Sequence, residues 1–195
     1  MAGEIIEQVG RYRVSLHHQE GADSPRVSGD PISNVVTAKN WRYDNVDSDG
    51  GPLQYGWDYF ADRENGDELF IRWARMTHGA VVVEDRPHDG ATAFWYLMPQ
   101  ALAEIGTVVD PVEFLNAEIR EYRSWAEGDV WGIVIEKSVI WEPKEGQVTH
   151  GDGISSRLTT WEHAESCWGY IGRTYAEREA KEQFEIYRNE EEKNA

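Results

Sequence analysis

The segment from Asp110 to Gly128 carries helix signals at both of its ends. Asp110 is suited to accept hydrogen bonds from the first turn, Pro111 fits the first helical position, and Glu113 places an acid near the helix N-terminus. Gly128 stands where a left-handed residue commonly follows a helix. The apolar residues between them recur at helical spacing and form one stripe: Val112, Leu115, Ile119, Tyr122 and Ala126. The sequence therefore predicts a helix here, and the fold has to bury its stripe.

A second helix is predicted near the end of the chain, from Thr174 to about Asn189, before a polar tail over residues 189–195 that we expect to fray. Its apolar stripe consists of Tyr175, Ala176, Ala180, Phe184 and Tyr187. Between the two helices, residues 129–136 alternate as a strand does, with Trp131, Ile133 and Ile135 on one face. Residues 161–170 combine glycine with aromatic residues and are predicted to be the partner strand.

The first half of the chain has the pattern of short strands separated by polar turns. Tyr12, Val14 and Leu16 alternate with polar residues, and further strands are predicted over residues 34–41, 68–76, 80–84 and 93–97, with a short helix over 99–105. Turn-forming and acidic residues near 44–52 predict a loop. The whole pattern predicts a single α+β domain over residues 1–195 with one core, a mostly antiparallel sheet and two late α-helices packed on it.

The chain is strongly acidic, with 36 Asp and Glu residues against 19 Lys and Arg residues and a net charge of −17. The imbalance is greatest between residues 41 and 70, where eight carboxylates accompany only Arg42 and Arg63. Such a surface repels nucleic acid and anionic lipid, so we expect neither as a direct partner. It suits binding to a basic protein whose surface normally contacts phosphates. The ordinary alternative is a charged surface that keeps the protein in solution.

Comparison with DNA sets a condition on mimicry. Duplex DNA carries one charge per roughly 1.7 Å of axis, so 17 charges match roughly 29 Å of duplex. A compact chain of this length is about 40 Å across. Mimicry therefore requires the carboxylates to gather on one face. The candidate contact residues combine these carboxylates with two aromatic anchors: Asp44, Asp47, Asp49, Trp57, Asp58, Tyr59, Asp62, Glu64, Asp67 and Glu68.

Several segments together resemble a set of small proteins encoded by phages and mobile elements. They are Pro25-Arg26, Asn34-Val-Val-Thr37, Trp41-Arg-Tyr43, residues 113–122, Gly128-Asp-Val-Trp-Gly132 and Glu165-Ser-Cys-Trp-Gly-Tyr-Ile-Gly172. The resemblance covers most of the chain and implies a phage or mobile-element origin. Members of this set join the two late strands by a short turn, whereas residues 138–160 form an inserted connection here.

Acidity and the implied origin lead to one functional hypothesis. We expect a phage-encoded inhibitor that binds a basic, nucleic-acid-binding host defence protein, in the manner of a DNA mimic of the anti-restriction or anti-CRISPR type. No catalytic residue, metal or cofactor is expected. The chain start lacks the regions of a signal peptide and no apolar run approaches about 20 residues, so the expected place of action is the host cytoplasm.

Two alternatives stay open. One is a small-ligand enzyme or nucleotide-sequestering anti-defence protein, with its pocket near His78 and His88. A hydrolytic or divalent-metal site there would add Asp85 and Asp89 and would need Asp62 or Glu64 to lie close. The other alternative is a phage accessory protein that assembles with itself.

Other chemical motifs favour structure over catalysis. His163 and Cys167 are four residues apart on a predicted strand, which separates them by about 13 Å, so we expect a buried structural thiol and no nucleophile. His17 and His18 point to opposite faces of a strand and do not suit a shared metal. Residues 169–172, Gly-Tyr-Ile-Gly, lack the spacing of a phosphate-binding loop and are interpreted as a place of tight packing.

Overall fold

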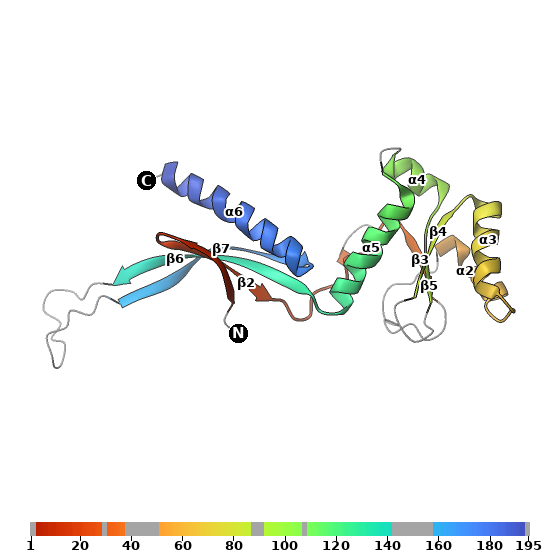
Figure 1. The fold of residues 1–195 in the computed structure, drawn as a ribbon, viewed down its shortest axis with the longest axis horizontal. Coiled ribbons are helices and arrows are strands. Elements are labelled where there is room, and N and C mark those ends of the chain that lie inside the picture. The colour runs from red at the N-terminus through yellow and green to blue at the C-terminus, as the bar shows by residue number, and fades with distance from the viewer. Residues whose placement is uncertain are drawn as a thin grey trace, which may run out of the picture. The chain divides into compact units, whose positions relative to one another are not determined.

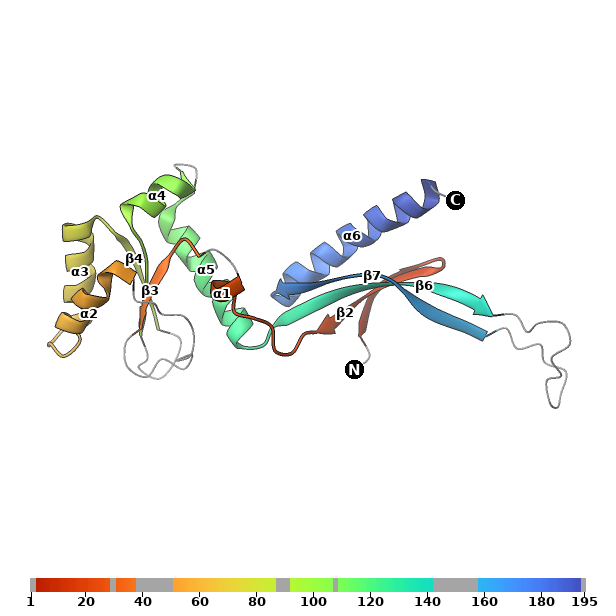
Figure 2. The ribbon, with the colours of Figure 1, turned by 180° about the vertical axis from the view of Figure 1, so that it is seen from behind.

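The computed structural model describes residues 3–28, 31–37, 51–86, 92–106, 109–141 and 158–193. These residues form six α-helices and seven strands, and every strand pair is antiparallel. The prediction of an α+β fold with antiparallel sheets is confirmed. The chain divides into two compact units, which we call unit 1 (Met1–Ala22 with Gly128–Ala195) and unit 2 (Asp23–Glu127). Figures 1 and 2 show their elements.

Unit 1 is a four-stranded sheet with one long helix. The strands lie in the order β1 (Glu4–Val9), β2 (Tyr12–His18), β6 (Val130–Trp141) and β7 (Leu158–Ile171). Helix α6 (Arg173–Lys193) lies along one face of this sheet (Figure 1). The late helix therefore packs on a sheet, as the sequence predicted.

The core of unit 1 follows from two periodicities. Alternate residues of β2 and β6 point to the same face, and every fourth residue of α6 meets them. The buried set is Tyr12, Val14, Leu16, Ile133, Ile135, Ala176, Ala180 and Phe184. The opposite face of the sheet carries the side chain of Trp168, which is 50% exposed.

Unit 2 has a three-stranded sheet in the order β3 (Asn34–Thr37), β5 (Ala93–Leu97) and β4 (Val81–Asp85). Strand β5 is central and all five of its residues are buried. Helices cover both faces, as Figure 2 shows. These elements are α1 (Pro25–Ser28), the 3-10 helix η1 (Gly51–Leu53), α2 (Gln54–Phe60), α3 (Gly66–His78), α4 (Pro99–Ile105) and α5 (Pro111–Ala126).

Strand β5 separates two cores within unit 2. Its odd-numbered residues, Ala93, Trp95 and Leu97, pack with Leu115, Ile119 and Tyr122 of α5. Its even-numbered residues, Phe94 and Tyr96, pack with Leu53, Trp57, Phe70 and Ala74 of the η1, α2 and α3 layer. The single core expected from chain length is therefore wrong for the described residues, which form three buried clusters. That both units act as one domain stays a prediction.

Helix α5 has the ends that the sequence predicted. The Asp110 carboxylate accepts hydrogen bonds from the backbone N–H groups of Val112 (2.7 Å) and Glu113 (3.3 Å). The last helical residue is Ala126, and Gly128 has the left-handed conformation, with φ of 80°. Arg123 forms an ion pair with Asp85, which is buried at the end of β4. This pair joins α5 to the sheet.

Three predictions about individual elements were wrong. Residues 68–76 belong to helix α3, where Phe70 and Ala74 are buried one turn apart, and do not form a strand. Helix α6 continues to Lys193, beyond the predicted fraying point at 189. The inserted connection over 138–160 is partly strand, because β6 runs to Trp141 and β7 starts at Leu158.

Residues 142–157 of that connection and residues 44–50 of the predicted acidic loop lie outside the described residues. Among the helices that are described, none has both the length and the apolar character needed to span a membrane.

Candidate functional site

A tight turn over residues 61–65 joins helices α2 and α3. The backbone N–H of Arg63 donates to the Phe60 carbonyl (2.9 Å), and that of Gly66 donates to the Arg63 carbonyl (3.0 Å). Asn65 has the left-handed conformation, with φ of 57°, which asparagine adopts more readily than most residues. At Gly66 a Cβ atom would lie 2.3 Å from the Phe60 carbonyl oxygen, so this position excludes a side chain. The turn is therefore held in one conformation.

This turn brings together five of the residues that the sequence predicted as partner contacts. Asp58 and Tyr59 end helix α2, Asp62 and Glu64 lie in the turn, and Glu68 lies in the first turn of α3. All five are exposed. We call this set the acidic corner. Acids in the first turn of α3 also interact favourably with the helix dipole, so Glu68 suits its position in the fold.

Two nearby cations, Arg63 and Arg86, are already engaged. The Arg63 guanidinium lies 3.9 Å from the centre of the Tyr59 ring, and its Nε donates to the Tyr59 carbonyl (3.1 Å). Arg86 contacts Glu84 (2.5 Å) and Asp67 (3.4 Å), and its pKa is raised by the hydrogen bond that it donates to Glu84 and by the attraction of that carboxylate. Asp67 is thus partly neutralised.

The acidic corner keeps most of its charge available. Within the described part of the chain, no ion pair holds Asp58, Glu64 or Glu68. Asp58 accepts a hydrogen bond from the Gln54 side chain (2.8 Å), which is a neutral group. These carboxylates can therefore meet a basic surface without first breaking an ion pair.

Trp57 does not have the role that the sequence predicted. It is only 7% exposed and packs between Phe70 and Phe94, with ring centres 5.7 and 5.0 Å away. It is a core residue and cannot be an exposed anchor. The aromatic residue that sequence reasoning missed is Tyr55, which is exposed one helical turn before Tyr59. Recognising residues 54–60 as a helix would have placed these two tyrosines on one face.

The three remaining predicted contacts, Asp44, Asp47 and Asp49, lie outside the described residues, as do His88 and Asp89 of the alternative small-ligand site. The described residues of that alternative site do not all lie close together. His78 ends helix α3, about 18 Å along the helix axis from the turn that carries Asp62 and Glu64. Its Nε2 lies 3.1 Å from the Tyr55 hydroxyl. Among the described residues, no group of three or more His, Cys, Asp or Glu side chains could hold a metal.

The prediction that Cys167 is a buried thiol is also wrong, because its side chain is exposed. Cys167 lies on β7, which among the described strands is at the edge of its sheet and pairs with β6 alone. A strand at this position has one side without a neighbouring strand. His163 lies on the same strand, so the expected separation of about 13 Å from Cys167 still argues against a catalytic pair.

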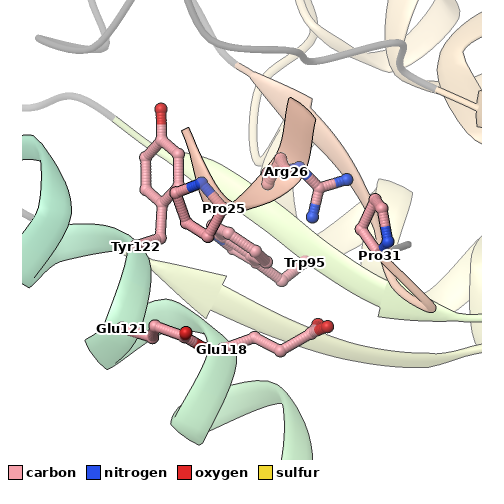
Figure 3. Close-up of a pocket in the computed structure, with 7 residues that line it drawn as sticks. All are labelled: Pro25, Arg26, Pro31, Trp95, Glu118, Glu121 and Tyr122. Atoms are coloured by element: carbon pink, nitrogen blue, oxygen red, sulfur yellow. The ribbon is translucent and has the colours of Figure 1, made fainter. Parts of the chain in front are cut away.

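Unit 2 also contains a polar pocket of about 230 Å³, drawn in Figure 3. Its lining combines aromatic rings, two prolines and charged groups: Pro25, Arg26, Pro31, Trp95, Glu118, Glu121 and Tyr122. The Arg26 guanidinium lies 5.1 Å from the centre of the Trp95 ring and donates to the Ser33 hydroxyl (3.3 Å) and carbonyl (3.0 Å). Sequence analysis did not predict this pocket, because its residues are far apart in the chain.

Two of the residues that line the pocket each have a polar side-chain atom without a hydrogen-bond partner among the described residues. These atoms are Nε1 of Trp95 and Oε2 of Glu118, and both atoms are buried. Burial raises the pKa of Glu118, and the charge of Glu121 adds to this shift, whereas the Ser33 hydroxyl and the Arg26 guanidinium oppose it.

Comparison with known proteins gives no further information on this site. No family model, curated protein or solved structure matches this chain.

Proposed function

We propose that this protein is a phage-encoded inhibitor that binds a basic, nucleic-acid-binding host defence protein through the acidic corner, in the manner of a DNA mimic. One observation carries the proposal. Four exposed carboxylates, those of Asp58, Asp62, Glu64 and Glu68, gather around one fixed turn together with Tyr59. Carboxylates in such a cluster meet the lysine and arginine side chains that otherwise bind phosphates.

The fold beneath the acidic corner supports this role. Phe70 and Trp57, on the inner sides of α3 and α2, are buried in the core, so the two helices present the carboxylates from a rigid base. A rigid surface loses little conformational freedom on binding, and more of the contact energy is retained as affinity. Tyr59 adds an aromatic contact of the kind enriched at the centres of interfaces. In this proposal the protein acts in the host cytoplasm by occupying its target, without catalysis.

The proposal is tested with two variants of equal net charge. The corner variant is Asp58→Asn/Asp62→Asn/Glu64→Gln. The control variant is Glu182→Gln/Glu185→Gln/Glu190→Gln, which changes three exposed carboxylates of α6. A partner captured from host lysate by the wild-type protein is titrated against all three proteins, with a short DNA duplex as competitor.

We expect the corner variant to bind roughly 3- to 100-fold more weakly, since exposed ion pairs contribute about 0.2–1 kcal/mol each. The control variant should bind as the wild type does, the duplex should compete, and affinity should fall steeply with salt. Equal weakening by both variants would mean that only net charge matters. An affinity independent of salt, or inhibition of excess target by a trace of protein, would contradict the proposal.

A further inference from the structure

The outer face of helix α3 carries an open groove of about 320 Å³. Its lining residues recur at the spacing of one side of a helix: Glu68, Ile71, Arg72, Arg75 and Met76. Met76 is 80% exposed, the largest value for a bulky apolar side chain in the described part of the chain. An apolar surface that charged groups surround is typical of a contact site for another protein.

The charges of this face are divided along the helix. Glu64, in the turn before α3, and Glu68 make the N-terminal half acidic, whereas Arg72 and Arg75 make the C-terminal half basic. Within the described residues no ion pair holds any of these four side chains. Arg75 donates a hydrogen bond to the Val82 carbonyl (3.0 Å), a neutral group that fixes the side chain without cancelling its charge. Both arginine charges are therefore available to a partner.

A second copy of this chain has the complementary surface. A two-fold axis can place two α3 helices side by side and antiparallel, so that each residue contact occurs twice. The acidic half of each helix then faces the basic half of the other, whereas a parallel pair would bring like charges together. The same arrangement covers Ile71 and Met76, which lose apolar surface to water on association.

We infer that this protein associates with a second copy of itself through the outer faces of two antiparallel α3 helices. Glu68 of each chain meets the basic half of the other chain, which consists of Arg72 and Arg75. One helix face makes a small contact, so we expect a reversible dimer with a dissociation constant between about 1 μM and 1 mM.

The inference goes beyond the proposed function and does not depend on it, because it is drawn from α3 alone. Glu64 and Glu68 also belong to the turn and helix end that carry the acidic corner. Self-association and binding of a basic target therefore compete for the same carboxylates. Experiments on the purified protein without a target separate the two proposals.

Sedimentation equilibrium of the full-length protein, from about 1 μM to about 1 mM, measures the association. The average mass should rise with concentration from the monomer value of 22.3 kDa and level off at twice this value. A mass that stays at the monomer value throughout would overturn the inference. A mass that exceeds twice the monomer value would contradict pairing about a two-fold axis.

Charge reversal locates the contact. Glu68→Arg and Arg72→Glu each place like charges against one another across the axis, so each should weaken the dimer roughly 10-fold or more. An equimolar mixture of the two variants should associate more tightly than either variant alone, because a more basic face then meets a more acidic one. The double variant Glu68→Arg/Arg72→Glu should recover most of the wild-type association.

Matched controls make the same charge changes elsewhere. Glu182→Arg on α6 and Arg120→Glu on α5 alter exposed positions and should dimerise as the wild type does. Circular dichroism checks folding, and Arg72→Glu carries the test if Glu68→Arg does not fold. Wild-type association of a folded Arg72→Glu protein, or a mixture that associates no more tightly than the single variants, would overturn the inference.

Discussion

The indole ring of Trp168 on β7 lies against Gly132, the residue that it pairs with on β6. A Cβ atom on Gly132 would be 2.1 Å from Cε3 of Trp168, so the missing side chain makes room for the ring. The exposed half of the ring faces away from the core that α6 covers, and the Trp168 and His17 rings meet in a T-shaped arrangement, with centroids 6.3 Å apart.

Gly132→Ala should therefore destabilise the protein by about 1–3 kcal/mol, since the added methyl group displaces a packed ring. In a Trp168→Ala background the same substitution should be neutral or stabilising, because alanine restricts the unfolded chain more than glycine does. Urea unfolding of the two single variants and the double variant measures the coupling. Additive effects of the two substitutions would show that the ring and the glycine do not depend on each other.

Trp57 and Tyr59, two residues apart on α2, should respond in opposite ways to truncation. Trp57→Ala empties a core position and should cost about 3–5 kcal/mol of unfolding free energy. Tyr59→Ala changes an exposed side chain and should alter stability by less than about 0.5 kcal/mol, while weakening binding to a captured partner. Chemical denaturation and binding titrations measure both effects. A stable Trp57→Ala protein would contradict the core position of this residue.

Cys167 should react with a thiol reagent in the native protein. Because its side chain is exposed, the colour change on adding Ellman's reagent should correspond to one thiol per chain without denaturant. Cys167→Ser should change the unfolding free energy by less than about 0.5 kcal/mol, as is usual for surface positions. Reaction only after unfolding would indicate that the thiol is protected in solution.

Glu118 should make stability depend on pH. Burial raises its pKa in the folded chain, so the folded state binds the proton more tightly than the unfolded state does. Stability should therefore fall as pH rises from the ordinary glutamate pKa, about 4.3, through the higher pKa of the folded state. Glu118→Gln should abolish this decrease in stability with rising pH.

The measurement for Glu118 is urea unfolding at a series of pH values. The gain in stability of Glu118→Gln over the wild type should be smallest below about pH 4 and should grow toward neutral pH. Glu104→Gln, at an exposed position, serves as the control and should show no comparable trend. A constant difference between Glu118→Gln and wild type at all pH values would show that the carboxyl does not titrate differently on folding.

The elements that sequence reasoning predicted well are those with local signals at their ends. Helix α5 has its cap at Asp110 and its terminating glycine at 128, and β5 and α4 begin and end where the sequence predicted. Helix α3 was missed because Leu69, Ile71 and Trp73 alternate with other residues as in a strand. The buried pair Phe70 and Ala74 and the acids of the first turn were the competing helix signals.

The sites were harder to predict because they depend on how distant segments pack. Nothing in the local sequence around Trp57 distinguishes a core aromatic from an exposed one, and both types occur on the same two-turn helix. Cys167 is exposed because β7 is an edge strand, which is a property of strand order. The pocket requires Arg26, Trp95 and Glu118 to meet across three elements, and no spacing in the sequence indicates that they do.

The insertion of unit 2 within unit 1 determines the order in which the protein can form during synthesis. Strand β2 needs β6 as its neighbour, and the hydrogen bond from the Gln19 N–H to the Val130 carbonyl (2.8 Å) closes the base of this pairing. Residues 23–127 are made in between, which takes roughly 5 to 20 s at ordinary translation rates. Unit 2 is fully synthesised before β6, and during this time the apolar face of β2 is not covered by α6. Slow codons within residues 23–127 would lengthen the time during which the nascent β1–β2 hairpin is accessible to chaperones and prone to aggregation.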